Sequence, residues 1–189
     1  MKRLFIAFKL DLASEYDTMM KQLKLATRFD EIKWVEGSLQ HLTLKFLGKT
    51  PDNKIAPLCK VLAEIANETD CFTLRINKLG VFGSHYHPTC LWLGFEEQPV
   101  LKQLFEKTEY RLTTELGFEA NDGNFVPHLT LGRIKKVDNK KRFWDAFNSN
   151  QPTYFQEFNI NEMILYRSQL EKEGPIYTVM GKWKLGYKV

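Results

Sequence analysis

The tetrapeptide His-Leu-Thr-Leu occurs twice in the chain, at residues 41–44 and at residues 128–131. The two copies begin 87 positions apart, which is close to half of the 189-residue sequence. That two of the chain's four histidines open this pattern by chance has odds on the order of one in 10⁵, if positions are independent. The repeat therefore indicates an internal duplication that leaves an equivalent strand in each half of the chain.

Each copy alternates in the way of a β-strand with one polar and one apolar face. Successive side chains of a strand point to opposite faces, so His41 and Thr43 share one face and Leu42 and Leu44 share the other. The same alternation holds for residues 128–131. If the two strands face each other across a cleft, two imidazoles and two hydroxyls converge on a small volume.

The four polar side chains, which are His41, Thr43, His128 and Thr130, suit acid–base chemistry on a phosphoryl group. Two histidines can divide the work of general acid and general base near neutral pH. Threonine hydroxyls can donate hydrogen bonds to the non-bridging oxygens that carry the charge. Because neither tetrapeptide contains a carboxylate, a metal site would need ligands from elsewhere. The alternative is two ordinary strand histidines bonded to their neighbours, which the matched pair disfavours.

The order of the predicted elements is that of an α+β protein with largely antiparallel sheets. Apolar alternation predicts strands at residues 3–10, 32–35, 39–47, 72–82, 90–95, from about 126, 155–166 and 176–185. Helical spacing predicts helices at residues 14–29, after Pro51, at 100–116 and around 142–147. No glycine-rich loop joins the first strand to its helix, which disfavours a doubly wound nucleotide-binding fold.

Composition narrows the class of protein further. With 43% hydrophobic and 26% charged residues, the chain is neither disordered nor a coiled coil, and its length suits one domain or two lobes that share a core. The three cysteines lack the spacing of a metal or redox motif, which favours a reducing compartment. No apolar run reaches the roughly 18 residues of a membrane span. The sequence therefore predicts a cytoplasmic protein that does not contact the membrane.

The net charge of +4 is concentrated in residues 133–142, where six basic residues accompany one aspartate. Such a segment is commonly a solvated surface, and its functional alternative is attraction of the phosphates of a nucleotide or nucleic acid. A nucleic-acid-binding module without turnover is therefore a second hypothesis for the whole chain. Phosphate binding alone, however, favours arginine and lysine over paired histidines.

The repeated motif and its flanks closely resemble a known family, the two-histidine phosphoesterases, and specifically the LigT-like RNA 2′,3′-cyclic phosphodiesterases of bacteria and archaea. The resemblance extends over essentially the whole chain, residues 1–189, as a single domain. The matching segments are Arg3–Ala7, Lys33–Val35, His41–Gly48, Trp92–Gly94, Pro127–Arg133, Tyr166–Leu170 and Gly174–Tyr177. It implies a bilobal α+β fold, in which two antiparallel sheets with flanking helices surround a central cleft with pseudo-two-fold symmetry.

The resemblance also implies roles for the paired motifs. His41 is expected to be the proton donor to the 3′-oxygen leaving group, and His128 the proton acceptor that activates water. Thr43 and Thr130 are expected to bind the phosphate, with a 2′-phosphomonoester as product and no metal or other cofactor. The implied partner is RNA or a nucleotide with a 2′,3′-cyclic phosphate end, bound by a monomer. The alternative activities are 2′-5′ RNA ligation and hydrolysis of another cyclic nucleotide phosphate.

Arg133, Phe125 and Tyr166 are predicted as further substrate contacts. Strict alternation from His128 sends Arg133 to the leucine face, so Arg133 reaches the cleft only if its strand ends or bulges near Gly132. Most other aromatic residues near the motifs are expected in the core rather than as base-stacking platforms; they are Phe5, Trp34, Phe46, Trp92 and Phe105.

The chain departs from the family pattern in the segment before the strand at residues 90–95. Gly83 and Thr89 stand where the family often has a proline and an arginine. A substrate contact from that arginine is therefore lost, or it is supplied by another residue such as His85 or His87. These two histidines have the spacing of a metal pair, but no third ligand lies near them in sequence, which favours a surface loop.

Overall fold

A computed structural model describes residues 1–121, 123–152, 156–172 and 174–186. Its strands are β1 (Lys2–Lys9), β2 (Glu31–Trp34), β3 (His41–Thr50), β4 (Phe72–Gly83), β5 (Pro88–Phe95), β6 (His128–Lys136), β7 (Glu157–Ile160), β8 (Glu162–Leu170) and β9 (Pro175–Lys184). Its α-helices are α1 (Ser14–Ala26), α2 (Ile55–Asn67), α3 (Pro99–Leu116) and α4 (Lys140–Ser149). The predicted α+β class is confirmed, with every described strand pair antiparallel.

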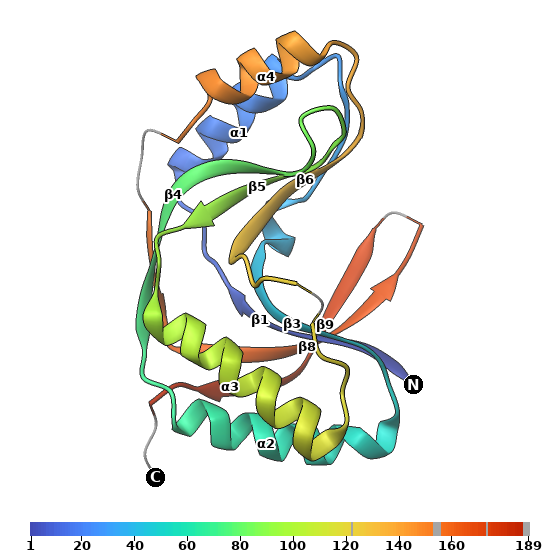
Figure 1. Ribbon diagram of the computed structural model, residues 1–189, viewed down its shortest axis with the longest axis vertical. Coiled ribbons are helices and arrows are strands. Elements are labelled where there is room, and N and C mark those ends of the chain that lie inside the picture. Colours follow the sequence, from blue (N-terminus) through green and yellow to red (C-terminus); the bar gives the residue numbers. More distant parts are fainter. Residues whose placement is uncertain (122, 153–155, 173, 187–189) are drawn as a thin grey trace.

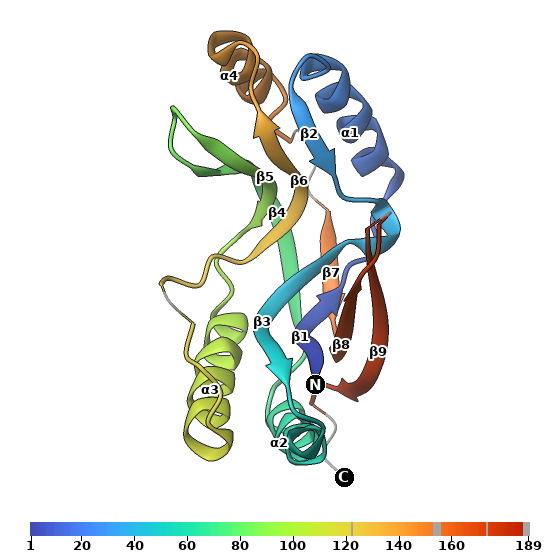
Figure 2. The same cartoon turned by 90° about the vertical axis from the view of Figure 1, so that its right-hand side faces the viewer.

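The strands follow one hydrogen-bonded path in the order β7-β4-β5-β6-β3-β1-β8-β9, and β2 also pairs with β6. The sequence predicted two sheets, whereas this path is continuous. Its two parts meet between β3 and β6 at one register pair, Leu42 with Leu129. We call β3, β1, β8 and β9 the β3 half, and β6, β5, β4, β7 and β2 the β6 half. The sheet is strongly curled, with α1 and α4 together at one end and α2 and α3 at the other (Figures 1 and 2).

The leucines of the two repeated motifs anchor both central strands in the core. Leu42, Leu44, Leu129 and Leu131 are all at most 1% exposed and belong to one hydrophobic cluster. Burying a leucine side chain contributes about 1.5–3 kcal/mol, so these four positions fix which face of each strand is turned inward. The opposite face, which carries the histidines and threonines, is thereby turned away from this core.

The predicted strand at residues 155–166 is wrong in one respect, because the structure divides its described part into two strands. β7 ends at Ile160 and pairs with β4, whereas β8 begins at Glu162 and pairs with β1. At Asn161 the chain thus passes from the end strand β7 to β8, which lies next to the strand at the opposite end of the path. Residues 153–155 lie outside the described residues. Among the described residues, none of the helices has the length and apolar character needed to cross a bilayer.

Candidate active site

The junction of the two halves brings the repeated motifs together. β3 and β6 are antiparallel with Leu42 opposite Leu129. Extending this register by one residue each way sets His41 across from Thr130. The same extension sets Thr43 across from His128. All four polar side chains lie on the face opposite the buried leucines and are half-buried. The structure therefore brings together the four predicted residues, with each imidazole beside the hydroxyl of the other motif.

Both imidazoles are oriented by the same backbone contact. His41 Nδ1 lies 2.7 Å from the carbonyl oxygen of Leu39, and His128 Nδ1 lies 2.8 Å from that of Val126. Because a carbonyl oxygen only accepts, Nδ1 carries the proton and donates in each case. Nε2 of each ring is then available to exchange a proton with a ligand. A contact two residues back along the chain is local, so each strand orients its own histidine.

Burial and charge lower the pKa of both histidines. Desolvation is the main cause for His41, opposed by the Leu39 carbonyl, and the charged form of His128 lowers the pKa of His41 further. Desolvation is also the main cause for His128, opposed by the Val126 carbonyl, with an additional lowering by Arg133. Both rings therefore favour the neutral form near pH 7. The effect of His128 on the pKa of His41 agrees with the strand register, which sets both rings on the same face.

A cluster of aromatic side chains surrounds His41. The rings of Phe5 and Tyr177 have their centroids 5.0 and 5.2 Å from that of His41. Phe5 in turn stacks on Tyr166 at 5.2 Å and contacts Phe46 at 6.0 Å. Phe5 is buried as expected, but the prediction that Phe46 is a core residue is wrong, because its side chain is 62% exposed. An exposed phenylalanine that contacts Phe5, the ring next to His41, is a candidate platform for a nucleobase.

The surroundings of His128 combine aromatic rings with positive charge. Phe82 and Trp92 have ring centroids 4.8 and 6.2 Å from that of His128. Trp92 is 7% exposed, and its ring lies against Gly80, where an added Cβ would meet it at 2.3 Å. Only glycine at this position leaves room for the indole. Arg133 supplies the charge, since it lowers the pKa of His128.

A β-bulge turns Arg133 to the face that carries the two histidines. Thr130 pairs with Trp92 and Gly132 pairs with Leu91, so Leu131 is an extra residue in β6. Alternation restarts after this bulge, and Arg133 is exposed on the face of the histidine. Burial raises the pKa of Tyr177, and the charge of Arg133 partly offsets this rise, although Tyr177 belongs to the β3 half. Strict alternation required a strand end or a bulge near Gly132 for Arg133 to share the face of His128, and the structure contains such a bulge.

The same irregularity in β3 explains the exposure of Phe46. Thr43 pairs with Ala7 and Lys45 pairs with Ile6, which leaves Leu44 as the extra residue. Phe46 then occupies the position of its strand that Arg133 occupies in β6. Sequence reasoning missed Phe46, and the available signal was its spacing, because both residues follow their histidine by five positions. Tyr177 was also missed as an individual site residue.

The remaining predicted contacts fall in different places. Tyr166 joins the aromatic group of His41 through Phe5. Phe125 is stacked on Phe105 with centroids 4.1 Å apart and packs against the core, which favours a structural role. The Thr89 hydroxyl donates to the Phe82 carbonyl.

The two histidines of the turn lie on the exposed tip of the β4–β5 hairpin, as a surface loop predicts. His85 stacks on Trp144 of α4 rather than on a site residue. His87 donates its backbone N–H to the Ser84 hydroxyl.

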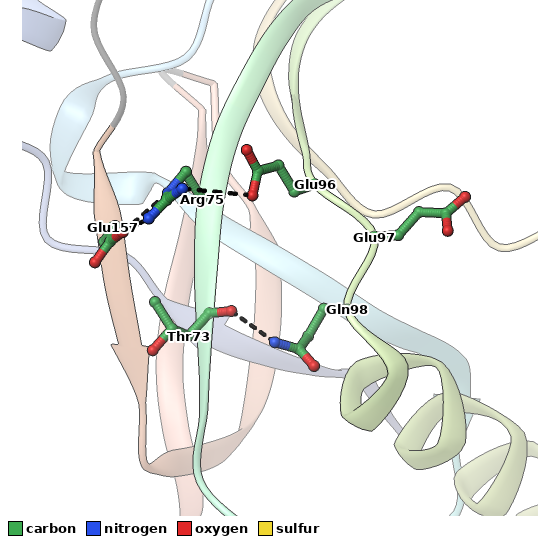
Figure 3. Close-up of a pocket in the computed structure, with 6 residues that line it drawn as sticks. All are labelled: Thr73, Arg75, Glu96, Glu97, Gln98 and Glu157. Carbon is green, nitrogen blue, oxygen red and sulfur yellow. Dashed lines mark hydrogen bonds and ion pairs between the residues drawn. The ribbon is translucent and has the colours of Figure 1, made fainter.

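Other hollows on the molecule do not share this chemistry. One lies where β4, β7 and the start of α3 meet, and Arg75 there is paired with both Glu157 and Glu96 (Figure 3). Gln98 donates to the Thr73 carbonyl at 2.9 Å, so the polar side chains that line this hollow link the start of α3 to β4. In the described part of the chain, no three His, Cys, Asp or Glu side chains gather closely enough to hold a metal ion.

Two imidazoles and two hydroxyls thus share one face of a curled antiparallel sheet, an arrangement with the groups that acid–base chemistry on a phosphate ester requires. The chain belongs to the LigT-like phosphoesterase family, whose model matches residues 11–92 and 96–177. A Methanocaldococcus jannaschii relative named RNA 2′,3′-cyclic phosphodiesterase is 30% identical over 96% of this chain and 99% of its own length. An Aquifex aeolicus protein of the same name is 35% identical over 82% of each chain.

A third relative of that name, from Geobacillus stearothermophilus, is 33% identical over 77% of this chain but only 46% of its own length. Among solved structures, TT0787 of Thermus thermophilus superposes with a TM-score of 0.77 at 26% identity, covering 97% of this chain and 98% of that one. Escherichia coli LigT complexed with 3′-AMP has a TM-score of 0.74 at 23% identity, with coverage of 98% and 99%. These likenesses extend over the whole fold.

Proposed function

We propose that this protein hydrolyses the terminal 2′,3′-cyclic phosphate of RNA to a 2′-phosphomonoester, using its two histidines as acid and base without a metal. The observation that carries the proposal is the junction of β3 and β6, which sets four His-x-Thr side chains on one face. Membership of the LigT-like phosphoesterase family and the names of the relatives support the substrate class.

In the proposed reaction, Nε2 of neutral His128 takes a proton from water as the water oxygen attacks phosphorus. The bond from phosphorus to the 3′-oxygen breaks, and protonated His41 donates its proton to that oxygen. The incoming and departing oxygens lie on opposite sides of phosphorus, so one histidine serves each side. Thr43 and Thr130 donate hydrogen bonds to the non-bridging oxygens, where the negative charge resides.

The surroundings of the two rings support this division of labour. Arg133 lowers the pKa of His128, which favours the neutral form that a general base needs. No arginine contributes to the lowered pKa of His41. A bound phosphate brings negative charge to the site and raises the pKa of a neighbouring imidazole, which favours protonated His41 in the complex. The acid is therefore assigned to His41, the ring whose pKa Arg133 does not lower.

Two further contacts complete the proposed binding site. Arg133 binds the phosphate from the β6 half, where its guanidinium complements the anionic group. Phe46 stacks on the terminal base from the β3 half, and Tyr166 and Tyr177 form the aromatic wall behind it. Phe125 is assigned to packing.

We further propose that the two halves are lobes of one domain related by a pseudo-two-fold axis. In the β3 half, Phe8 pairs with Leu42 and Ala7 with Thr43; in the β6 half, Leu93 pairs with Leu129 and Trp92 with Thr130. The two matched segments of the family model support the same duplication. The enzyme is proposed to act as a cytoplasmic monomer, in keeping with three free cysteines.

The test is to incubate the protein with 2′,3′-cyclic AMP and with RNA that ends in a 2′,3′-cyclic phosphate, and to identify the phosphomonoester. We expect the 2′-phosphate from both substrates, with none from the His41→Ala/His128→Ala double variant. Turnover of neither substrate by the wild-type protein contradicts the proposal. Formation of the 3′-phosphate would reverse the position of the leaving group and contradict the assigned regiochemistry.

A further inference from the structure

The tip of the β4–β5 hairpin, residues 84–87, is exposed but firmly held. His85 stacks on Trp144 of α4 with centroids 4.6 Å apart and planes 10° apart, and the Trp144 indole N–H donates to the His85 carbonyl at 3.2 Å. Ser84 and His87 exchange backbone hydrogen bonds of 3.1 Å across the turn. The tip is therefore docked on α4, and its side chains are presented in a fixed arrangement.

Tyr86 is the side chain that this tip presents to solvent. Its side chain is 73% exposed, and the Lys140 ammonium lies 5.3 Å from its ring centroid. An exposed aromatic ring on a rigid turn gains nothing from burial. Next to a cation, it has the two components that single-stranded nucleic acids require, which are a stacking surface for a base and a charge for a phosphate.

The charge that is free to bind a ligand lies on three residues of the basic segment. Several of its cations are already paired: Lys135 with Glu31, Lys141 with Asp145 and Arg142 with Asp138. Across the described residues, no carboxylate pairs with Arg133, Lys136 or Lys140. The segment as a whole is thus less basic than its sequence suggests, and its unpaired charge runs from the site toward Tyr86.

These residues are continuous with the active site. β6 runs from His128 past Arg133 to Lys136, and α4 begins at Lys140. At about 3.3 Å per residue, this strand spans roughly 26 Å, enough for several nucleotides. Phe82, at the base of the hairpin, contacts the His128 ring at 4.8 Å. A strand of RNA that leaves the cleft along β6 reaches the hairpin tip.

We propose that Tyr86, Lys136 and Lys140, here called the hairpin-tip surface, bind the single-stranded RNA on the 5′ side of the terminal cyclic phosphate. The inference rests on the proposed function and extends it, because it makes RNA, rather than a cyclic mononucleotide, the better substrate. Tyr86 stacks on a base while Lys136 and Lys140 bind phosphates. Base stacking tolerates any sequence, so the surface selects for a single strand and not for a particular base.

The experiment compares two substrates, 2′,3′-cyclic AMP and a single-stranded RNA of about ten nucleotides with a 2′,3′-cyclic phosphate end. For Tyr86→Ala and Lys140→Ala we expect kcat/KM to fall about 5- to 100-fold on the RNA and to stay unchanged on cyclic AMP. Lys140→Ala should also reduce the salt dependence of RNA binding by about one phosphate contact. Tyr86→Phe keeps the ring and should retain the wild-type rate on RNA.

Matched controls are available on the same chain. Lys141→Ala removes a neighbouring charge that is paired with Asp145, and Tyr110→Ala removes a 68% exposed tyrosine from α3 at the other end of the molecule. Neither should change the rate on RNA. The inference is overturned if the controls lose as much as Tyr86→Ala and Lys140→Ala, if those variants lose activity equally on both substrates, or if the RNA rate does not change.

Direct binding separates this inference from the proposed function. Fluorescence anisotropy with the same RNA carrying a 2′-phosphate end needs no turnover. If the wild-type protein hydrolyses neither substrate but Tyr86→Ala and Lys140→Ala bind this RNA 5- to 100-fold more weakly than the controls, the function fails and the surface stands. Hydrolysis with equal binding by all variants retains the function and rejects the surface.

Discussion

The β3 half and the β6 half share the same backbone framework at the site but surround their histidines differently. Over nine residues, β3 and β6 have the same succession of buried and exposed positions, and each histidine donates to the carbonyl two residues before it. The bulge after each threonine is also shared. The residue that follows it is Phe46 in one half and Arg133 in the other.

This difference indicates how two similar halves can give their histidines different properties. The common backbone framework positions both imidazoles, whereas the side chains around each imidazole affect its pKa. An aromatic group surrounds His41, and a guanidinium acts on the pKa of His128. The position before these residues differs too: Lys45 is buried in the β3 half, while Gly132 lies under β2, where an added Cβ would meet Ile32 at 2.7 Å.

The largest expected effect comes from removing either histidine. His41→Ala and His128→Ala should each lower turnover about 10²- to 10⁴-fold, and the double variant should lose less than the product of the two. A phosphodiester with a much more acidic leaving group needs little protonation, so it should rescue His41→Ala and not His128→Ala. The opposite rescue would exchange the two roles. Steady-state kinetics on both substrates provide the measurement.

The buried lysine of the β3 half should matter for stability. Lys45 is fully buried and donates to Glu109 at 2.6 Å and to the Glu119 carbonyl at 2.9 Å. Lys45→Met removes the charge partner of the Glu109 carboxylate, which keeps, among the described residues, only the backbone N–H of Asn121, so the free energy of unfolding should fall by about 3–5 kcal/mol. Adding Glu109→Gln should recover most of this loss, and Lys49→Met, on the exposed face of the same strand, should have little effect. Denaturant unfolding measures all three; an unchanged stability in Lys45→Met would mean that the pair contributes nothing.

Arg133 and Phe46 should differ in the kind of loss that they cause. Arg133→Gln removes a charged contact and should lower kcat/KM on cyclic AMP by about 10- to 100-fold. It should also raise the pKa of His128 and move the acidic limb of the pH–rate profile to higher pH, because the base is then protonated more readily. Phe46→Ala should raise KM about 5- to 100-fold without moving the profile.

Phe46→Tyr serves as the control for this comparison, since it keeps the stacking surface. A pH profile that moves with Phe46→Ala, or that stays in place with Arg133→Gln, would contradict the assignment of the two residues to base stacking and to charge.

A smaller effect is expected on stability at acidic pH. Folding lowers the pKa of His41 and His128 below the ordinary 6.5, so the unfolded chain takes up protons first as the pH falls. The contribution of these two histidines to the free energy of unfolding should therefore be constant above about pH 6.5. It should fall below that pH and level off once the pH is below their folded-state pKa. Each histidine contributes on the order of 1 kcal/mol per unit of pKa difference.

The histidine contribution is isolated by comparing the His41→Gln/His128→Gln double variant with His85→Gln, which changes an exposed residue. The double variant should show a shallower loss of stability between pH 6.5 and pH 5, whereas His85→Gln should follow the wild type. Identical slopes in all three proteins would show that the two site histidines do not resist protonation.

The smallest expected effect is that of metal removal. Because both the acid and the base of the proposed reaction are side chains, a chelator should leave the rate nearly unchanged on cyclic AMP. A large loss that one divalent metal restores would overturn the mechanism. In that case, His85 and His87 would become the first candidates for its ligands.

The sequence by itself determined the elements that depend on local pattern. Alternation placed His41 and Thr43 opposite the leucines, and the repeat identified His128 and Thr130 as their counterparts, because a strand has a fixed two-residue period. The strands were predicted from this two-residue period and the helices from their 3.6-residue period, with the break at Asn161 as the main error. Neighbouring residues in the chain contain that information.

Only the tertiary structure decided which faces and partners the remaining residues have. A bulge is a feature of strand pairing, so alternation could not place Arg133 or reveal that Phe46 is exposed. Phe125 stacks on Phe105 of the preceding helix, and Lys45 pairs with Glu109 of the same helix. The continuous sheet and the free charge beside Tyr86 likewise depend on residues far apart in sequence, whose contacts form only when the chain folds.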